Sequence, residues 1–253
     1  NAETIKLTFG GSTTWTTPQS SANGSFSIVA TVPVQNAGVK TITAVGFTSG
    51  HTGEGTYSIK GQFTITPISG SVGSIITVNG SGFSPSQSVY IHFGITMTIA
   101  WTSTDVAGGF SKVFTVDTQP YGTTTVSITD IAGTGLADNQ FVTIVGNIFK
   151  IEPISGTVGS TVTVYGNGFG VSQTITINFA TAYDNPVTVS GSSTQFGSFS
   201  ISFTVNVQPY GSHTITATVN VTTGTNSFFI TAKIVNVTRT EGTVGSEVTV
   251  LGN

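Results

Sequence analysis

Apolar and polar residues alternate in short runs along most of the chain. Across residues 161–205 the apolar side chains occupy every second position of three successive runs, with mostly Thr, Ser and Asn between them: Val162, Val164, Ile175, Ile177, Phe179, Ile201, Phe203 and Val205. A period of two places these side chains on one face of each strand, which is typical of half-buried antiparallel sheets. No window of comparable length has the 3.6-residue period of an amphipathic helix. The pattern therefore predicts an all-β protein.

The strand runs belong to a repeat. Residues 70–81 (GSVGSIITVNGS), 156–167 (GTVGSTVTVYGN) and 242–253 (GTVGSEVTVLGN) resemble one another and start at a constant spacing of 86 residues. Six or seven short strands with turns about every 8–12 residues favour an immunoglobulin-like β-sandwich in each repeat. A small barrel is the alternative, but a unit this short scarcely allows closure between its first and last strands.

The repeat predicts a division of the chain with one unit incomplete. We expect a unit lacking its first strand at 1–66, complete units at 67–152 and 153–238, and a C-terminal strand at 239–253 that is the first strand of a fourth unit. Residues 4–10 (TIKLTFG) match the second strand of the later units (TITINFA at 174–180). The first unit therefore lacks the strand that the C-terminal segment has left over.

Composition excludes several classes of function. Charged residues make up 7% of the chain, against roughly 25% in average globular proteins. The net charge is −3 and no basic stripe occurs, which argues against a nucleic-acid partner. There is no cysteine and no apolar run long enough for a membrane-spanning helix.

Catalytic motifs are equally sparse. His51, His92 and His213 fall at non-equivalent positions of three different units, and no Gly-x-Ser-x-Gly elbow stands between a strand and a helix. We therefore expect the chain not to be an enzyme and to hold no cofactor.

Two weaker binding interpretations stay open. Asp130, Asp138 and Glu152 could supply oxygen ligands for calcium, but these acidic positions do not recur in the other units. Four aromatic residues are candidate carbohydrate platforms: Trp15, Trp101, Tyr121 and Tyr210. The structural interpretation is that the tryptophans fill sandwich cores and the tyrosines brace corners.

Four Asn-x-Ser/Thr sequences permit N-glycosylation if the protein is secreted by an organism that glycosylates. They are centred on Asn23, Asn79, Asn220 and Asn236.

The start of each repeat resembles a known family. Residues 65–83 (ITPISGSVGSIITVNGSGF) and 151–169 (IEPISGTVGSTVTVYGNGF) are similar to the opening of IPT/TIG-type immunoglobulin-like domains, with a Pro, a Gly-containing turn, an alternating strand and then Gly-Phe. The third opening departs from this pattern, since Arg239 stands where Pro67 and Pro153 stand. We interpret the two prolines as markers of domain joints.

The incomplete unit suggests assembly. A sandwich without an end strand exposes apolar side chains and unpaired backbone groups, which favour pairing with another chain. We expect the C-terminal segment to complete the first unit of a neighbouring copy, through Val244, Glu247, Val248, Thr249, Val250 and Leu251. The accepting residues would be Ile5, Leu7, Phe9, Phe26, Ile28 and Ile42.

Repetition of this head-to-tail contact would give an extracellular filament of identical subunits, which other filaments or cell surfaces could in turn bind. The Thr-rich, charge-poor repeats are similar to those of archaeal extracellular threads, which assemble in this way. The alternatives are a fragment of a longer repeat adhesin or S-layer-associated glycan-binding protein, and a ring closed within one chain.

Overall fold

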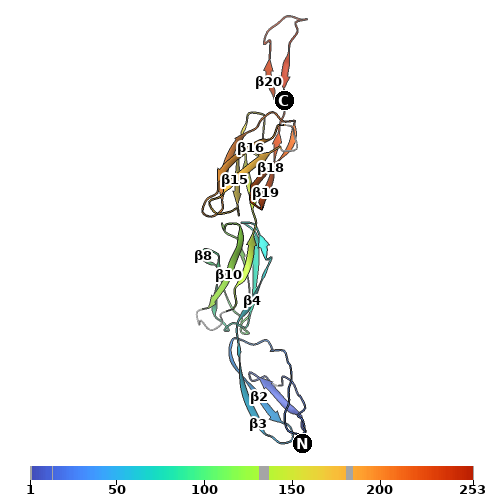
Figure 1. Cartoon of the computed structure of the whole chain (residues 1–253), viewed down its shortest axis with the longest axis vertical. Helices are drawn as coiled ribbons and strands as arrows, with labels where there is room; N and C mark the ends of the chain where they lie inside the picture. The colour runs from blue at the N-terminus through green and yellow to red at the C-terminus, as the bar shows by residue number, and fades with distance from the viewer. Residues whose placement is uncertain (1, 13, 131–136, 181–184, 253) are drawn as a thin grey trace. The chain divides into compact units, whose positions relative to one another are not determined.

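The structure is a computed structural model that describes residues 2–12, 14–130, 137–180 and 185–252 (Figure 1). These residues form twenty-one β-strands and no helix. The strands pair into immunoglobulin-like sandwiches that follow one another along the chain, so the predicted all-β fold class is confirmed. None of the described segments is a helix of the length and apolarity needed to cross a membrane.

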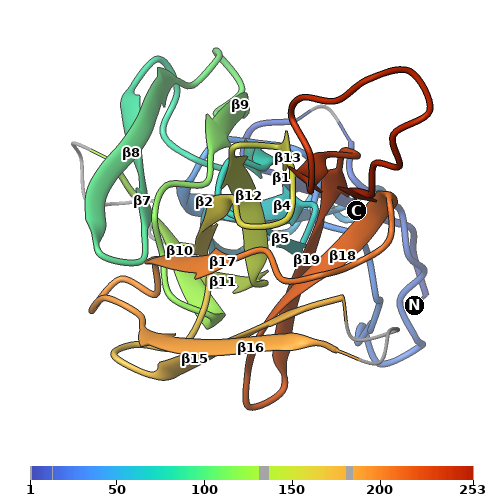
Figure 2. The same ribbon diagram turned by 90° about the horizontal axis from the view of Figure 1, so that it is seen from above.

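The third sandwich shows the complete arrangement. One sheet has the order β12 (Asn147–Glu152), β14 (Thr161–Asn167) and β17 (Phe199–Thr204). The other has the order β13 (Ser155–Gly156), β19 (Thr222–Ile230), β18 (Gly211–Val219), β15 (Thr174–Phe179) and β16 (Val187–Ser192). Strands β12, β13 and β15 to β19 are labelled in Figure 2. All pairs are antiparallel except β13 with β19, which is parallel.

Alternating side chains of both sheets form the core of this sandwich. Phe179 of β15 packs against Phe203 of β17, with ring centroids 4.9 Å apart, and against Phe228 of β19 at 6.1 Å. Val162 and Val164 of β14 are fully buried among them. The period of two therefore serves its expected purpose, which is to place one face of each strand in a shared apolar layer.

The second sandwich repeats the same order. Its first sheet is β4 (Gln62–Thr66), β6 (Ile75–Ser81) and β9 (Phe110–Thr115). Its second is β5 (Ser69–Gly70), β11 (Gln140–Ile144), β10 (Gly122–Asp130), β7 (Ser88–Phe93) and β8 (Thr96–Ser103).

The two prolines do not mark joints between sandwiches. Pro67 lies between β4 and β5, and Pro153 lies between β12 and β13; in each case the two strands belong to opposite sheets of one sandwich. Proline has no N–H to donate to a ladder, so it suits the point where the chain leaves one sheet for the other. By strand pairing the second sandwich therefore starts at Gln62, before the boundary expected at residue 67.

The first unit contains a single sheet of three strands, β1 (Ile5–Phe9), β2 (Gly38–Gly46) and β3 (Thr52–Ile59). Its register matches that of β15, β18 and β19: Gly38 pairs with Ile59, as Gly211 pairs with Ile230. Residues 24–34 correspond in sequence to β9 and β17, yet form no strand. The described part of the unit thus has one sheet of the sandwich and not the other.

The C-terminal residues form a separate hairpin, β20 (Ile234–Val237) with β21 (Val250–Gly252), shown in orange to red in Figure 1. We expected the third unit to extend to residue 238, but its last sheet strand, β19, ends at Ile230. The expected C-terminal strand at 239–253 forms a strand only over β21, and Asn253 lies outside the described residues. The segment that the sequence predicts to be a single strand therefore forms one strand of a two-stranded hairpin.

Candidate functional site

An apolar groove runs over the first unit. It has a volume of about 480 Å³ and is lined by Leu7, Trp15, Phe26, Ile28, Ile42, Ala44, Gly53, Glu54 and Gly55. A neighbouring hollow of about 330 Å³ adds Glu3, Ile5 and His51 to the surfaces of Phe26, Ala44 and Gly53. Glu54 is the one charged residue among those lining the larger groove. The groove therefore suits an apolar occupant.

The groove is open because its side chains lack the covering that their counterparts have. Phe26 is 41% exposed, whereas Phe199 at the same place in β17 is 5% exposed. Ile28 is 41% exposed, whereas its counterpart Ile201 is 8% exposed. In the third sandwich β14 lies beside β17 and completes the cover. No described strand of the first unit occupies the place of β14.

The backbone of the same segment is also unpaired. β17 pairs with β14 over six residue pairs, from Thr161 with Thr204 to Gly166 with Phe199. Among the residues that the structure describes, 26–34 make no backbone–backbone hydrogen bond. The indole Nε1 of Trp15 donates to the Thr31 carbonyl oxygen at 2.7 Å and holds the segment near the sheet. The groove thus offers both apolar surface and free backbone groups.

The residues predicted to accept a strand divide into two groups. Leu7, Phe26, Ile28 and Ile42 line the groove, and Ile5 lines the adjoining hollow. Phe9 lines neither: it is fully buried, with its ring 5.1 Å from that of Trp15 and 5.9 Å from that of Tyr57.

Five residues that line the groove were not predicted from the sequence: Trp15, Ala44, Gly53, Glu54 and Gly55. The alternation Ile42, Ala44 along β2 already placed Ala44 on the face of Ile42. Trp15 gave no such signal, because it lies outside the repeated strands.

The C-terminal hairpin exposes side chains whose counterparts are buried. Val250 is 53% exposed and Val248 is 54% exposed, whereas Val164 and Val162 are fully buried. Ile234 and Val237 of β20 are likewise exposed, and Ile148 and Ile151 at their places in β12 are buried. Val248 and Val250 were predicted from the sequence, but the two residues of β20 were not, because residues up to 238 were assigned to the third unit.

The other residues predicted to be donated differ in kind. Val244, Glu247, Thr249 and Leu251 are all exposed. Leu251 takes the place of Tyr165, and Thr249 takes the place of Thr163, neither of which is in the buried core of the third sandwich. Their alternation with Val248 and Val250 puts Thr249 and Leu251 on the opposite face of the strand.

The turn of the hairpin has the form seen inside both complete sandwiches. The Thr243 N–H donates to Ser246 Oγ at 3.1 Å and the Ser246 N–H donates to the Thr243 carbonyl oxygen at 2.9 Å. Thr157 and Ser160 make the same two bonds, both at 3.0 Å. Gly245 has φ of 92°, and Gly159 has 86°. Glycine adopts this left-handed backbone without steric cost. The turn of the hairpin therefore already has the shape that it has in the two complete sandwiches.

The register of the hairpin also reproduces that of β12 with β14. Ile234 pairs with Gly252, and Val237 with Val250, with a bulge between Ile234 and Asn236. β12 and β14 have a bulge at the equivalent place, between Ile148 and Lys150. The hairpin thus has the same register as β12 and β14, but its apolar side chains are exposed.

The weaker binding interpretations gain little from the structure. Within the described ranges no three His, Cys, Asp or Glu side chains gather where they could hold a metal ion. Of the three candidate calcium ligands, Glu152 instead pairs with Lys150, with Nζ 2.6 Å from Oε2.

The expectation that both tryptophans fill cores is wrong for Trp101. It is 60% exposed, because it lies on β8, at the edge of its sheet. Trp15 is half-buried against Phe9. Tyr121 and Tyr210 are exposed, and the Tyr210 ring lies 5.2 Å from that of Phe229.

All four candidate glycosylation sites lie on the surface. Asn23 precedes residues 24–34, Asn220 lies in the turn between β18 and β19, and Asn79 and Asn236 lie in β6 and β20. Asn236 takes the place of Lys150, whose side chain is 51% exposed in the third sandwich. Asn236 therefore lies at a position that is exposed in the third sandwich as well.

Among the described residues, Glu3 and Lys150 have shifted pKa values. Hydrogen bonds from the Ser49 hydroxyl and N–H, helped by the Thr48 N–H, lower the pKa of Glu3 below its usual value of 4.5. The hydrogen bond to Glu152 raises the pKa of Lys150 above its usual value of 10.5. Glu3 thereby ties the start of the first unit to the loop between β2 and β3.

Comparisons with known proteins give no family. No family model matches the chain, and no curated protein sequence matches it. Many solved structures show some likeness. One is a tetra-tandem repeat from the extending region of a large adhesion protein, with 15% identity over 92% of this chain and 70% of that chain and a TM-score of 0.33.

Two further solved structures have similarly low sequence identities and TM-scores. The adhesin InvE of Yersinia pseudotuberculosis has 11% identity over 67% of this chain and 58% of that chain, with a TM-score of 0.34. The D0–D1 domain of intimin has 16% identity over 67% of this chain and 99% of that chain, with a TM-score of 0.25. At these scores the fold is better defined by the strand order and pairing given above. The likeness to IPT/TIG-type domains stays a resemblance of sequence.

Proposed function

We propose that this chain is the structural subunit of an extracellular filament. Its C-terminal segment would complete the first unit of a neighbouring copy, and repetition of that contact would extend the filament. One observation carries the proposal: the same chain holds a groove without its covering strand and a hairpin without its core, and the two are counterparts of elements that pair within the third sandwich.

The apolar surface available is large enough to drive such a contact. Burying a Val or Ile side chain contributes about 1.5–3 kcal/mol, and the hairpin exposes four whose counterparts are buried: Ile234, Val237, Val248 and Val250. Phe26 and Ile28 would gain cover as well. Association costs roughly 4–15 kcal/mol in lost translation and rotation, so this set of side chains is comparable with what a stable contact requires.

The geometry of the contact favours an open chain of subunits. The groove belongs to the first unit and the hairpin follows the third sandwich, so the two surfaces are different and the contact is heterologous. A heterologous contact continues into a filament unless its rotation closes a ring. The partners are then identical subunits, with other filaments or cell surfaces as further contacts.

The surface chemistry is consistent with a place outside the cell. Four exposed asparagines are available for N-glycosylation, and Ser and Thr rather than charged residues provide most of the polar surface. The proposal assigns no catalytic role to the chain.

The test is assembly of the purified chain, measured by light scattering and electron microscopy. Val250→Asp should abolish filaments, because it places a carboxylate at a position that is fully buried in the counterpart Val164. Val113→Asp is the matched control, since Val113 is 54% exposed on strand β9 and Val250 is 53% exposed on β21.

The control should assemble as the unaltered chain does. If the unaltered chain stays monomeric at all concentrations, the filament is wrong, and a section of a longer repeat adhesin becomes the better interpretation. If Val250→Asp assembles normally, the donated segment is not the contact.

A further inference from the structure

The element that completes the first unit can be specified more closely, given the proposed function. We infer that it is the whole hairpin β20–β21 of a second copy, docked as a preformed two-stranded unit in a single register. In that register Val248 lies opposite Ala30, Val250 opposite Ile28, and Gly252 opposite Phe26.

The register follows from the pairing of β14 with β17. Val162 pairs with Phe203, Val164 with Ile201, and Gly166 with Phe199. Residues 24–35 (GSFSIVATVPVQ) align without a gap to 197–208 (GSFSISFTVNVQ), and residues 242–252 align without a gap to 156–166. When the pairs of β14 with β17 are applied to the aligned residues of the hairpin and of 24–35, they give a single register. A slip of one residue would turn Val248 and Val250 to the solvent side.

The turn of the hairpin adds a second restraint. In the third sandwich the Gly159 N–H donates to the Val205 carbonyl oxygen at 2.8 Å, and the Val205 N–H donates to the Ser160 carbonyl oxygen at 2.9 Å. Gly73, Ser74 and Val116 make the same two bonds in the second sandwich, both at 2.8 Å.

The corresponding groups of the first unit and the hairpin are available for the same bonds. The counterpart of Val205 is Val32, within the segment that has no backbone partner among the described residues. The counterparts of Gly159 and Ser160 are Gly245 and Ser246, in a turn that already has the required shape. Two hydrogen bonds at Val32 would therefore fix the end of the docked hairpin.

A phenylalanine lying over a glycine gives a third restraint. A Cβ on Gly166 would lie 2.2 Å from the Phe199 ring, and one on Gly80 would lie 2.1 Å from the Phe110 ring, so both rings lie directly on glycine backbone. In the docked register the corresponding pair is Phe26 and Gly252. In the free hairpin the nearest atom to a Cβ on Gly252 is the Lys233 carbonyl oxygen, at 3.2 Å.

The hairpin would also reach the sheet β1–β2–β3 of the unit. In the third sandwich β13 pairs in parallel with β19, and the Thr231 N–H donates to the Gly156 carbonyl oxygen at 2.8 Å. The equivalent contact joins Gly242 of the hairpin to Lys60, just after β3.

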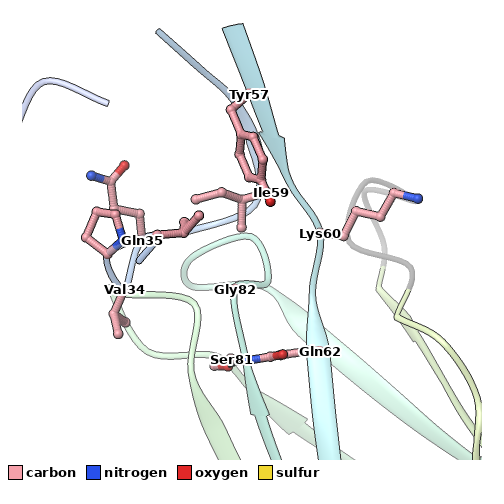
Figure 3. A pocket seen from close by; sticks show the side chains of 10 residues that line it. Val34, Gln35, Tyr57, Ile59, Lys60, Gln62, Ser81 and Gly82 are labelled. Carbon is pink, nitrogen blue, oxygen red and sulfur yellow. Dashed lines mark hydrogen bonds between the residues drawn. The ribbon is translucent and has the colours of Figure 1, made fainter. Parts of the chain in front are cut away.

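Figure 3 shows a hollow that Val34, Tyr57 and Ile59 line together with Gln62, Ser81 and Gly82. Val32 also lines it. Val244 is the counterpart of Val158, which packs against the core of the third sandwich. Val244 is fully exposed in the hairpin. The docked register would bring Val244 to the hollow beside Ile59.

Disulfide cross-linking tests the register directly, because the chain has no cysteine of its own. Val29→Cys with Thr249→Cys forms an aligned pair: their counterparts Ser202 and Thr163 pair in the ladder, with hydroxyl oxygens 2.9 Å apart. Val29→Cys with Leu251→Cys is the matched diagonal control, one pleat away on the same face. Each double variant is assembled under reducing conditions, oxidised, and run on a denaturing gel without reductant.

The aligned pair should give a ladder of dimers, trimers and longer species. The diagonal pair should give roughly tenfold less, because a disulfide requires Cα atoms about 4.4–6.8 Å apart and diagonal neighbours lie about 7–8 Å apart. Circular dichroism before oxidation checks that both variants fold as the unaltered chain does.

The remaining outcomes separate this inference from the function on which it rests. Filaments in which the diagonal pair cross-links as well as the aligned pair, or in which neither does, would overturn the register and leave the filament standing. If disulfides formed only within single chains, the hairpin in the groove would belong to the same chain and not to a second copy. Absence of assembly would remove both proposals together.

Discussion

The first unit and the third sandwich use nearly the same residues for one sheet and differ in the other. Ile5, Leu7 and Phe9 of β1 are buried, as are their counterparts on β15, although the first unit has no described strand in the place of β14. Phe26 and Ile28 remain half-exposed where Phe199 and Ile201 are buried. The sheet β1–β2–β3 is therefore paired and buried on one face, whereas the segment opposite has no covering strand among the described residues.

The strongest way to probe this difference is to remove the same ring from both units. Phe199→Ala should destabilise the third sandwich by about 3–5 kcal/mol, as is usual for a buried phenylalanine. Phe26→Ala should cost the unassembled first unit much less, because the ring is already 41% exposed. Urea unfolding of both variants, each in the Val250→Asp background that keeps the chain monomeric, measures the two changes.

Phe26→Ala should affect assembly more than it affects the stability of the monomer. In filaments of otherwise unaltered chain, Phe26→Ala should raise the concentration needed for assembly, because the ring is then covered. Equal destabilisation of both units in the monomer would show that the first unit is already complete.

Hydrogen exchange should distinguish the two units without any change of side chain. Amides of 26–34 should exchange quickly in monomeric chain, because they have no backbone partner among the described residues, whereas amides of β17 should be protected. In filaments both should be protected. Protection of 26–34 in the monomer would contradict the proposal, as would its absence in filaments.

A smaller effect is expected from a single methyl group. Gly252→Ala should weaken assembly by about 1–3 kcal/mol, a usual cost of overpacking, because the added Cβ meets the Phe26 ring in the docked register. Gly50→Ala controls for a glycine altered elsewhere, since no atom lies within 4 Å of a Cβ at Gly50; its positive φ of 68° affects stability rather than assembly. Normal assembly of Gly252→Ala would argue against that register.

The smallest effect concerns pH. Because its hydrogen bonds lower the pKa of Glu3 in the folded first unit, the carboxylate adds stability above its unfolded pKa. That contribution is lost as the pH falls through the folded pKa. Glu3→Gln should therefore lower the melting temperature of the first unit slightly at pH 7 and not in strong acid. Glu54→Gln is the charge-matched control, and an equal loss at both pH values would exclude ionisation as the cause.

Much of the fold could be predicted from the sequence because it depends on periodicity. The period of two along 161–205 gave the strands, and the spacing of 86 residues gave the repeat. The match of residues 4–10 to 174–180 predicted a strand where β1 lies and identified it as the counterpart of β15. Leu7, Phe26, Ile28 and Ile42 followed from the same alternation, and the structure gathers them around one groove.

The limits of the hairpin could not be predicted in this way. Ile234 and Val237 alternate as any strand does, so the pattern could not show whether β20 ends the third unit or starts another. Only pairing decides this, and β20 pairs with β21. Trp101 was misplaced for a related reason, because alternation along β8 does not show that it is an edge strand.

The close copy of an internal strand pair in the hairpin has a consequence for which unit a free hairpin could enter. A hairpin so similar to β12 and β14 would suit the second and third sandwiches as well as the first unit. In those sandwiches, however, the resident strands are tethered to the same chain, at effective concentrations of about millimolar. A free hairpin would have to displace them. Among its described residues the first unit has no tethered strand at that place, so a free hairpin would meet no such competitor there.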